Sequence, residues 1–201
     1  MNIAGFDEVG RGCIAGSVVA AAVILPAHAP WLGELKDSKR ITPKKREQLA
    51  EIIRRESIAW AVGRAEVDEI YRLNILEASM LAMSRAYLGL SVKPDKGVVD
   101  GNRYPAIDCP GEAIIGGDAS VPEISAASII AKVYRDNEMT IMDQLFPGYG
   151  MAIHKGYPTR LHLSRLARLG ISPVHRLGYK PVQAMLASSL GTPLDPQRPL
   201  K

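Results

Sequence analysis

Four acidic residues stand where apolar segments of this sequence end, a pattern that can bind metal ions. Asp7 and Glu8 lie at the exit of one apolar segment, Asp100 ends a second, and Asp118 ends a third. In an α/β sheet, strand ends are where functional groups from distant parts of the sequence converge. Carboxylate oxygens suit Mg²⁺ and Mn²⁺, and two such ions about 3.5–4 Å apart can clamp the attacking and leaving oxygens of a phosphodiester. Taken singly, each acid has the alternative role of capping a turn or a helix.

A glycine-rich stretch directly after the first pair of acids invites a different interpretation. Residues 10–15 read Gly-Arg-Gly-Cys-Ile-Ala, which matches the dinucleotide-binding pattern G-x-G-x-x-A. That pattern requires a helix whose N-terminus meets the pyrophosphate. Residues 17–25 are rich in β-branched side chains and favour a strand, so we reject nucleotide binding. The glycines on either side of Arg11 instead allow the backbone to approach a ligand closely.

The elements that must position these groups can be read from periodicity and from turn residues. Short apolar segments favour strands at residues 3–7, 15–25, 58–67, 96–100 and 113–118. Helix start signals predict helices over 43–56, from Asn74 onwards, over 122–146 and over 159–169. This order predicts an α/β fold, a mixed β-sheet flanked by helices, with a C-terminal helical extension.

Composition excludes several classes of protein. The chain has 201 residues, 47% of them hydrophobic, which suits one globular domain. Its two cysteines, Cys13 and Cys109, form no CxxC pair, so we expect free thiols in a reducing cytoplasm rather than a zinc site or disulfide framework. The acidic start does not resemble a signal peptide, and the longest apolar run, 18–25, is short of the ~20 residues of a membrane helix. We therefore predict a soluble, cytoplasmic protein with no membrane contact.

Several sequence blocks together resemble the ribonuclease HII family, the type 2 ribonucleases H. Each block alone is weak, but their order matches over nearly the whole chain, from Gly5 to Val182. The blocks lie at residues 5–12 (GFDEVGRG), 15–16, 35–39 (LKDSK), 74–75, 82–83, 99–101 (VDG), 117–119 (GDA), 125–133 (SAASIIAKV), 135–136 and 154–157 (HKGY).

The resemblance implies a ribonuclease H-like fold and a metal-dependent endonuclease. The implied reaction cuts the RNA strand of RNA–DNA hybrids and the phosphodiester 5′ to single ribonucleotides embedded in duplex DNA. It leaves 3′-hydroxyl and 5′-phosphate ends, with a role in ribonucleotide removal during DNA repair and replication. The implied cofactors are two divalent ions, Mn²⁺ or Mg²⁺, and the implied partner is the nucleic acid, bound by a protein that is monomeric.

The resemblance also assigns residues to the metal site. Asp7, Glu8, Asp100 and Asp118 match the family's four metal-binding catalytic acids. Asp136 is the rival for the fourth position, but its place inside a helix beside a basic residue favours a structural ion pair.

A second set of residues is implied to contact the substrate. The Gly10, Arg11 and Gly12 element matches the backbone groups that read the ribose 2′-hydroxyl, the one group that separates RNA from DNA at a fixed site. Tyr157 matches a tyrosine that packs on the sugar of the following deoxynucleotide. The remaining expected contacts are backbone and phosphate contacts of Ser38, Lys39 and Asn102.

Some residues depart from the family pattern or have a structural interpretation. Cys13 and Ser17 stand where prolines are usual, Pro158 follows Tyr157, and residues 175–179 (HRLGY) replace a more usual Arg-Ser-Phe-like stretch. The three histidines in the C-terminal part lack metal-ligand spacing, and we expect structural or surface roles for them. A set of small and basic residues shares one face of the 122–146 helix and is interpreted as close packing: Ser125, Ser128 and Lys132.

The domain prediction is a catalytic core at 1–150, a substrate-contacting extension of the same domain at 151–190, and a flexible Pro-rich tail at 191–201. Setting the four metal-binding acids aside leaves 17 of the 21 acidic side chains against 25 basic ones, a surface suited to phosphates. Two alternatives stay open: another nuclease of this fold, HIII-like or a junction resolvase, and a non-catalytic nucleic-acid-binding module.

Overall fold

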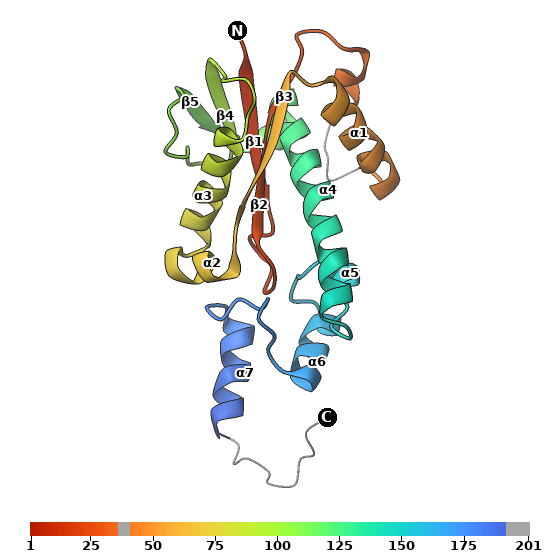
Figure 1. Cartoon of the computed structure of the whole chain (residues 1–201), viewed down its shortest axis with the longest axis vertical. Coiled ribbons are helices and arrows are strands. Elements are labelled where there is room, and N and C mark those ends of the chain that lie inside the picture. The colour runs from red at the N-terminus through yellow and green to blue at the C-terminus, as the bar shows by residue number, and fades with distance from the viewer. Residues whose placement is uncertain (36–40, 192–201) are drawn as a thin grey trace.

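The sheet of the computed structural model has five strands and mixed direction (Figure 1). The structure describes residues 1–35 and 41–191, with side chains to 188. The strands β1 (Ile3–Val9), β2 (Val18–Ile24), β3 (Ala59–Ala65), β4 (Lys96–Asp100) and β5 (Gly111–Ile114) are arranged in the order β3-β2-β1-β4-β5. β1 is antiparallel to β2 and parallel to β4, and β5 continues the parallel half. The predicted mixed sheet is confirmed, and β1 lies at its centre.

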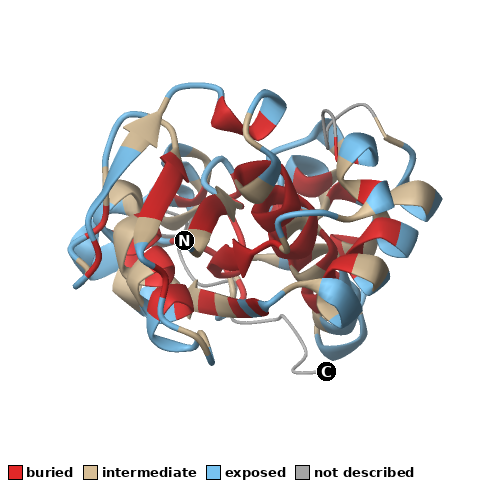
Figure 2. Cartoon of the chain, turned by 90° about the horizontal axis from the view of Figure 1, so that it is seen from above, coloured by how far each residue is buried: buried red, intermediate tan, exposed pale blue. Residues whose placement is uncertain are grey.

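Helices cover both faces of this sheet. One face packs against α2 (Val67–Leu73) and α3 (Ile75–Leu88), and the other against α1 (Pro43–Glu56) and α4 (Pro122–Leu145) (Figure 1). Alternation along β2 explains the two cores, because Ala20, Ala22 and Ile24 face α3 while Ala21 and Val23 face α4. Buried segments accordingly run through the middle of the molecule in Figure 2. Within the described ranges, no helix is both long and apolar enough to cross a bilayer.

The remaining helices are short or lie near the C-terminus. They are the 3₁₀ helices η1 (Pro30–Glu34) and η2 (Gly117–Ala119), and α5 (Met151–His154), α6 (Arg160–Leu169) and α7 (Lys180–Gly191). The C-terminal helices pack around the segment between β1 and β2. Ile14 lies against Leu166 of α6 and Val182 of α7, and Ala15 lies against Met151 of α5.

Two predicted strands are shorter in the structure. The strand predicted at 15–25 begins only at Val18, because Gly16 adopts φ +79° and Ala15 makes a single antiparallel bridge to His175 instead. The strand predicted at 58–67 ends at Ala65, where Glu66 opens α2 with a capping box. Local backbone geometry therefore sets the start of β2 and the end of β3.

The strand predicted at 113–118 was wrong over residues 115–118, and it begins earlier than predicted, at Gly111. β5 ends at Ile114, and Gly116 turns the chain with φ +69°. Asp118 therefore lies in η2, four residues beyond the strand, rather than at a strand end. A turn and a 3₁₀ helix therefore position Asp118, whereas strands position Asp7 and Asp100.

Candidate active site

Three of the predicted acids share one cavity at an end of the sheet. Phe6 of β1 stands opposite Val99 of the parallel strand β4, so the residues that follow, Asp7 and Asp100, emerge side by side. The cavity has a volume of about 340 Å³. Its lining consists of Asp7, Glu8, Val9, Gly10, Arg11, Gly12, Arg46, Asp100, Ser128, Lys132 and Tyr157.

Asp7 is the most perturbed of these acids. Its side chain is 6% exposed and accepts hydrogen bonds from the backbone N–H of Glu8, at 2.7 Å, and from the hydroxyl of Ser128 on α4. Burial, reinforced by the negative charges of Glu8 and Asp100, raises the pKa of Asp7 to about 8, although both hydrogen bonds oppose the shift. Such a buried group of like charges is unfavourable without a cation between them.

The other two acids of the cavity are held by donors from their surroundings. Glu8 Oε1 accepts from Arg11 Nη1 at 2.9 Å, across a half-exposed ion pair. Asp100 Oδ1 accepts from the backbone N–H of Gly117 at 2.8 Å, which ties the end of β4 to η2.

Asp118 is buried one residue beyond Gly117 and outside the set that lines the cavity. Its carbonyl accepts a hydrogen bond from the Ser125 hydroxyl on the first turns of α4. The structure therefore brings Asp7, Glu8 and Asp100 together and links Asp118 to Asp100 through Gly117.

The donor set fits a hard divalent cation. All four groups offer carboxylate oxygens, and a cation would relieve the repulsion that raises the pKa of Asp7. In the described part of the chain, no three His, Cys, Asp or Glu side chains stand converged in a ready-made cage. Binding an ion therefore requires the side chains to draw together, and for Glu8 it competes with Arg11.

The glycine-rich loop forms a second wall of the cavity. Gly10 has φ +96°, and a Cβ there would lie 2.4 Å from Nε of the buried Arg135, so only glycine fits. Cys13 N–H closes the turn on the Gly10 carbonyl at 3.3 Å. A Cβ on Gly12 would lie 3.8 Å from Cε1 of Tyr157, which is 40% exposed. The structure thus brings the Gly10–Gly12 loop and Tyr157 face to face beside the acids.

The remaining predicted substrate contacts are not found among the residues that line this cavity. Asn102 is exposed and lies outside the residues that line the cavity. Ser38 and Lys39 lie outside the described residues.

Sequence reasoning missed three polar residues that line the cavity: Arg46 of α1, and Ser128 and Lys132 of α4. The spacing of Ser128 and Lys132 on one helix face was the available signal, but it fits close packing equally well. Arg46 stands in a run of basic residues that reads as a solvated helix face.

Asp136, the rival acid, lies outside the residues that line the cavity and forms an ion pair within α4, with Lys132 rather than with the adjacent Arg135. Its Oδ1 pairs with Lys132 Nζ at 2.7 Å, one helical turn away on α4. The neighbouring Arg135 turns elsewhere, to Glu138 at 3.5 Å and the Ala15 carbonyl at 3.0 Å.

Three histidines form a buried cluster behind Tyr157. The rings of His154 and His162 stack at 3.9 Å, and His162 Nε2 lies 3.2 Å from His175 Nε2. His162 Nδ1 contacts the Tyr157 carbonyl, so it carries the proton, while His175 Nδ1 accepts from Ser172 N–H. One proton then lies between the two Nε2 atoms, donated by His175. The structural role expected for these histidines agrees with this arrangement.

The cluster makes stability fall in acid. Burial lowers the pKa of His162 and of His175 to about 4. The unfolded chain binds protons near pH 6.5, so this stabilisation is complete above that pH and is lost as the pH falls towards 4. For one histidine, the loss between pH 7 and pH 5 is about 2 kcal/mol. Because Asp7 titrates in the opposite sense, the measurement is the urea-unfolding difference between wild type and His175→Asn at both pH values. This difference in the free energy of unfolding should be smaller at pH 5 than at pH 7 by about 2 kcal/mol, and an equal difference at the two pH values would contradict the prediction.

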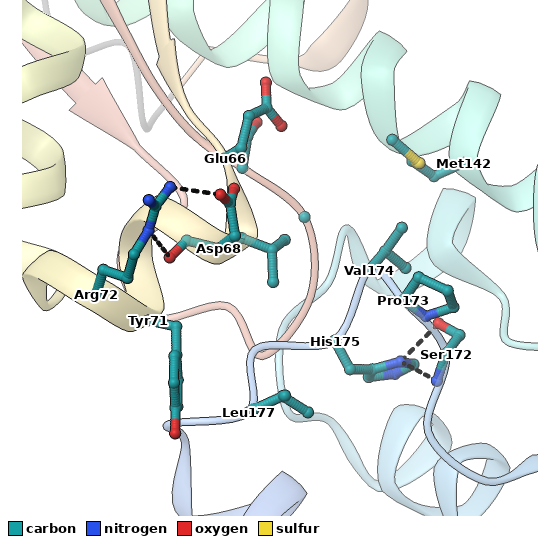
Figure 3. Close-up of a pocket in the computed structure, with 13 residues that line it drawn as sticks. Glu66, Asp68, Tyr71, Arg72, Met142, Ser172, Pro173, Val174, His175 and Leu177 are labelled. Atoms are coloured by element: carbon teal, nitrogen blue, oxygen red, sulfur yellow. Dashed lines mark hydrogen bonds and ion pairs between the residues drawn. The ribbon is translucent and has the colours of Figure 1, made fainter.

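A larger cavity of about 530 Å³ lies elsewhere, between α2, the end of α4 and residues 172–177 (Figure 3). Its surroundings include Tyr71, Met142, Val174 and Leu177, and Asp68 pairs with Arg72 at its rim. It contains none of the predicted site residues.

Comparison with known proteins identifies the family that the chain matches. A family model described as Ribonuclease HII matches residues 4–182. A ribonuclease HII from Methylococcus capsulatus is 63% identical over 154 residues, which cover 77% of this chain and 79% of that protein.

Solved structures show the same fold. Ribonuclease H2 from Pyrococcus horikoshii matches with a TM-score of 0.80 at 26% identity, over 96% of this chain and 100% of that one. RNase HII from Archaeoglobus fulgidus, solved in complex with PCNA, gives 0.75 at 27% identity, over 90% and 96%. Bst-RNase HIII in complex with Mn²⁺ gives 0.75 at 17% identity, over 94% and 70%.

Proposed function

The chain belongs to the ribonuclease HII family and is a ribonuclease H, a hydrolase, and we propose that it cuts both RNA–DNA hybrids and single embedded ribonucleotides. The bond cut is the phosphodiester 5′ to the ribonucleotide, leaving 3′-hydroxyl and 5′-phosphate ends. One observation carries this proposal: three of the acids that suit metal ions, Asp7, Glu8 and Asp100, line the same cavity as the loop that suits a ribose. Phosphodiester chemistry and recognition of one sugar can therefore occur on the same nucleotide.

The proposed metal ligands are Asp7, Glu8, Asp100 and Asp118, with Mg²⁺ or Mn²⁺ as the ion. When bound, a pair of divalent ions supplies activation of the attacking water and charge stabilisation at the departing 3′ oxygen. Support comes from the all-oxygen donor set and from a fold shared with an enzyme solved with Mn²⁺. Ser128 holds the Asp7 carboxylate by a hydrogen bond, and the Gly117 N–H holds Asp100.

The proposed reader of the ribose is the Gly10-Arg11-Gly12 backbone. The 2′-hydroxyl both donates and accepts, so backbone groups at a fixed distance can test for it. Tyr157 presents a partly exposed ring opposite Gly12, where it can pack on the next sugar. Arg11 belongs to the proposed ribose-reading loop and pairs with Glu8, so it links that loop to the proposed metal ligands.

Phosphate contacts are proposed for two sets of residues. Ser38, Lys39 and Asn102 come from the family resemblance, and Arg46 and Lys132 from their place in the cavity lining. Such contacts position the duplex without reading its sequence.

The experiment that tests this function uses a DNA duplex with one ribonucleotide, incubated with Mg²⁺, Mn²⁺ or EDTA. We expect a single cut 5′ to the ribonucleotide with either metal and none with EDTA. An all-RNA strand in a hybrid should also be cut. Cutting of an all-DNA junction in place of the ribonucleotide duplex would support a resolvase, and binding without metal-dependent cutting would support a non-catalytic module.

Tyr157→Ala should slow cleavage at a single ribonucleotide by roughly tenfold, as loss of about 1.4 kcal/mol of ring packing implies. Tyr157→Phe keeps the ring and should retain near wild-type rates. The measurement is kcat/KM on the ribonucleotide duplex, together with the Mg²⁺ concentration that gives half-maximal activity. That concentration should not change, and a Tyr157→Ala enzyme with wild-type kcat/KM would remove this residue from the site.

We further propose a role in removing ribonucleotides during DNA repair and replication, by a monomeric enzyme of the cytoplasm. The described cysteines, Cys13 and Cys109, are both buried free thiols, which suits a reducing compartment. Residues 1–150 form the proposed core and 151–190 the extension that contacts substrate; residues 192–201 of the predicted tail lie outside the described residues.

A further inference from the structure

A buried arginine lies behind the ribose-reading loop. Arg176 is 1% exposed and has no carboxylate within ion-pair distance among the described residues. Burial lowers its pKa. A buried charge without a counter-ion is costly, so it must be compensated by hydrogen bonds. Its neighbours His175 and Leu177 line the apolar cavity of Figure 3, whereas Arg176 between them donates to the loop.

The guanidinium holds three carbonyls of the segment that joins β1 to β2. Nε donates to the Gly16 carbonyl at 2.8 Å, Nη2 to that of Ser17 at 2.9 Å, and Nη1 to that of Arg11 at 3.2 Å. The backbone N–H of Arg176 also donates to the Ile14 carbonyl at 2.8 Å. A planar fork with five donors can do this, and a lysine cannot.

The Arg11 carbonyl receives a second donor. The Tyr179 hydroxyl donates to it at 2.8 Å and also accepts from Arg176 Nη1 at 3.1 Å. A carbonyl oxygen has two lone pairs, so Arg176 and Tyr179 together saturate it. The orientation of the Arg11–Gly12 peptide plane is thereby fixed from the C-terminal side.

The other end of that plane lies at the substrate cavity. The described peptide bonds are trans, and in a trans peptide the N–H points opposite to the carbonyl. The Gly12 N–H therefore points away from Tyr179, on a residue that lines the cavity beside Tyr157. No described residue accepts a hydrogen bond from it.

We propose that Arg176 and Tyr179 are positioning residues that hold the Arg11 carbonyl and so direct the Gly12 N–H at the ribose 2′-hydroxyl. The inference rests on the proposed function, since it presumes that this loop reads the ribose. Neither residue touches the substrate; both act through one peptide plane.

The test is Tyr179→Phe, which removes one hydroxyl and leaves the ring. The measurement is the ratio of dissociation constants, in EDTA, for two duplexes that differ only in a ribonucleotide or deoxyribonucleotide at one position. Wild type should prefer the ribonucleotide, and Tyr179→Phe should lose about threefold to tenfold of that preference, the range expected for one hydrogen bond. Affinity for the all-DNA duplex and the Mg²⁺ concentration for half-maximal cleavage should not change.

Tyr87→Phe is the matched control, because the Tyr87 hydroxyl also donates to a backbone carbonyl, that of Asp108, at 2.6 Å, outside the site. It should keep the wild-type preference. Arg176→Lys should lose more of the preference for the ribonucleotide than Tyr179→Phe. If Arg176→Lys fails to fold, the comparison of Tyr179→Phe with Tyr87→Phe still tests the inference. An unchanged ratio in Tyr179→Phe, or an equal loss in Tyr87→Phe, overturns the inference. A wild-type enzyme without any preference would instead overturn the proposed recognition of the 2′-hydroxyl, and the inference with it.

Discussion

Asparagine in place of Asp7 is expected to reduce cleavage of the ribonucleotide duplex by at least about a thousandfold, since metal ions contribute several kcal/mol to such reactions. Asp7 is the buried acid beside Glu8 and Asp100, and burial, reinforced by their negative charges, raises its pKa. A neutral amide keeps the size of the side chain but removes the charge that attracts a cation. Metal-dependent activity should therefore be lost while the fold is kept.

The same substitution should leave the metal-free protein at least as stable as wild type. Burial and the nearby carboxylates make the charged form of Asp7 unfavourable, and asparagine has no such form. Thermal unfolding in EDTA at pH 8 measures this directly. Added Mg²⁺ should raise the wild-type Tm and leave that of Asp7→Asn almost unchanged.

Asp68→Asn is the control for this experiment. Asp68 pairs with Arg72 on the exposed surface of α2, where ion pairs contribute little. Its activity and its response to Mg²⁺ should match wild type. Retained cleavage in Asp7→Asn would show that this buried acid is structural and does not hold a catalytic metal ion.

A large loss of stability is expected from Gly5→Ala. Gly5 lies in β1 directly beneath the first turn of α4, and an added Cβ would lie 2.1 Å from the carbonyl carbon of Glu123. Backbone cannot yield as a flexible side chain does, so we expect a loss of about 3 kcal/mol or more. Since α4 carries Ser128, its displacement should also weaken the hold on Asp7 and lower activity.

Urea unfolding measures this change, and Gly33→Ala is the matched control. A Cβ on Gly33 would meet no atom within 4 Å, so that variant should stay within about 1 kcal/mol of wild type. A Gly5→Ala protein of wild-type stability would mean that β1 and α4 do not pack as closely as the structure places them.

The sequence predicts the site best where a single local rule places a residue. Asp7 and Asp100 follow apolar strands, and the parallel pairing of those strands brings them together. Apolar periodicity predicts a strand that runs through Gly116 and ends at Asp118, but the left-handed backbone of Gly116 makes a turn that periodicity does not reveal.

Contacts between distant segments could not be predicted in this way. Lys132 and Arg46 lie on helices whose charged faces look solvated until α1 and α4 are placed beside the sheet. The bond from Tyr179 to the Arg11 carbonyl joins residues 168 positions apart, and no spacing rule connects them. Local signals therefore located the acids, and only the folded chain shows what holds the loop.

The residues that hold the glycine loop in place are synthesised long after the loop itself. The segment around Ile14 is enclosed by Gly156 and by residues 174–176, which are synthesised long after it. At about 5–20 residues per second, some 160 residues take roughly 10 to 30 seconds to translate. During that time a nascent chain already carries Asp7 and Glu8 but has no backing for its glycine loop. The backing of the glycine loop is thus completed late in biogenesis, when the last helices dock.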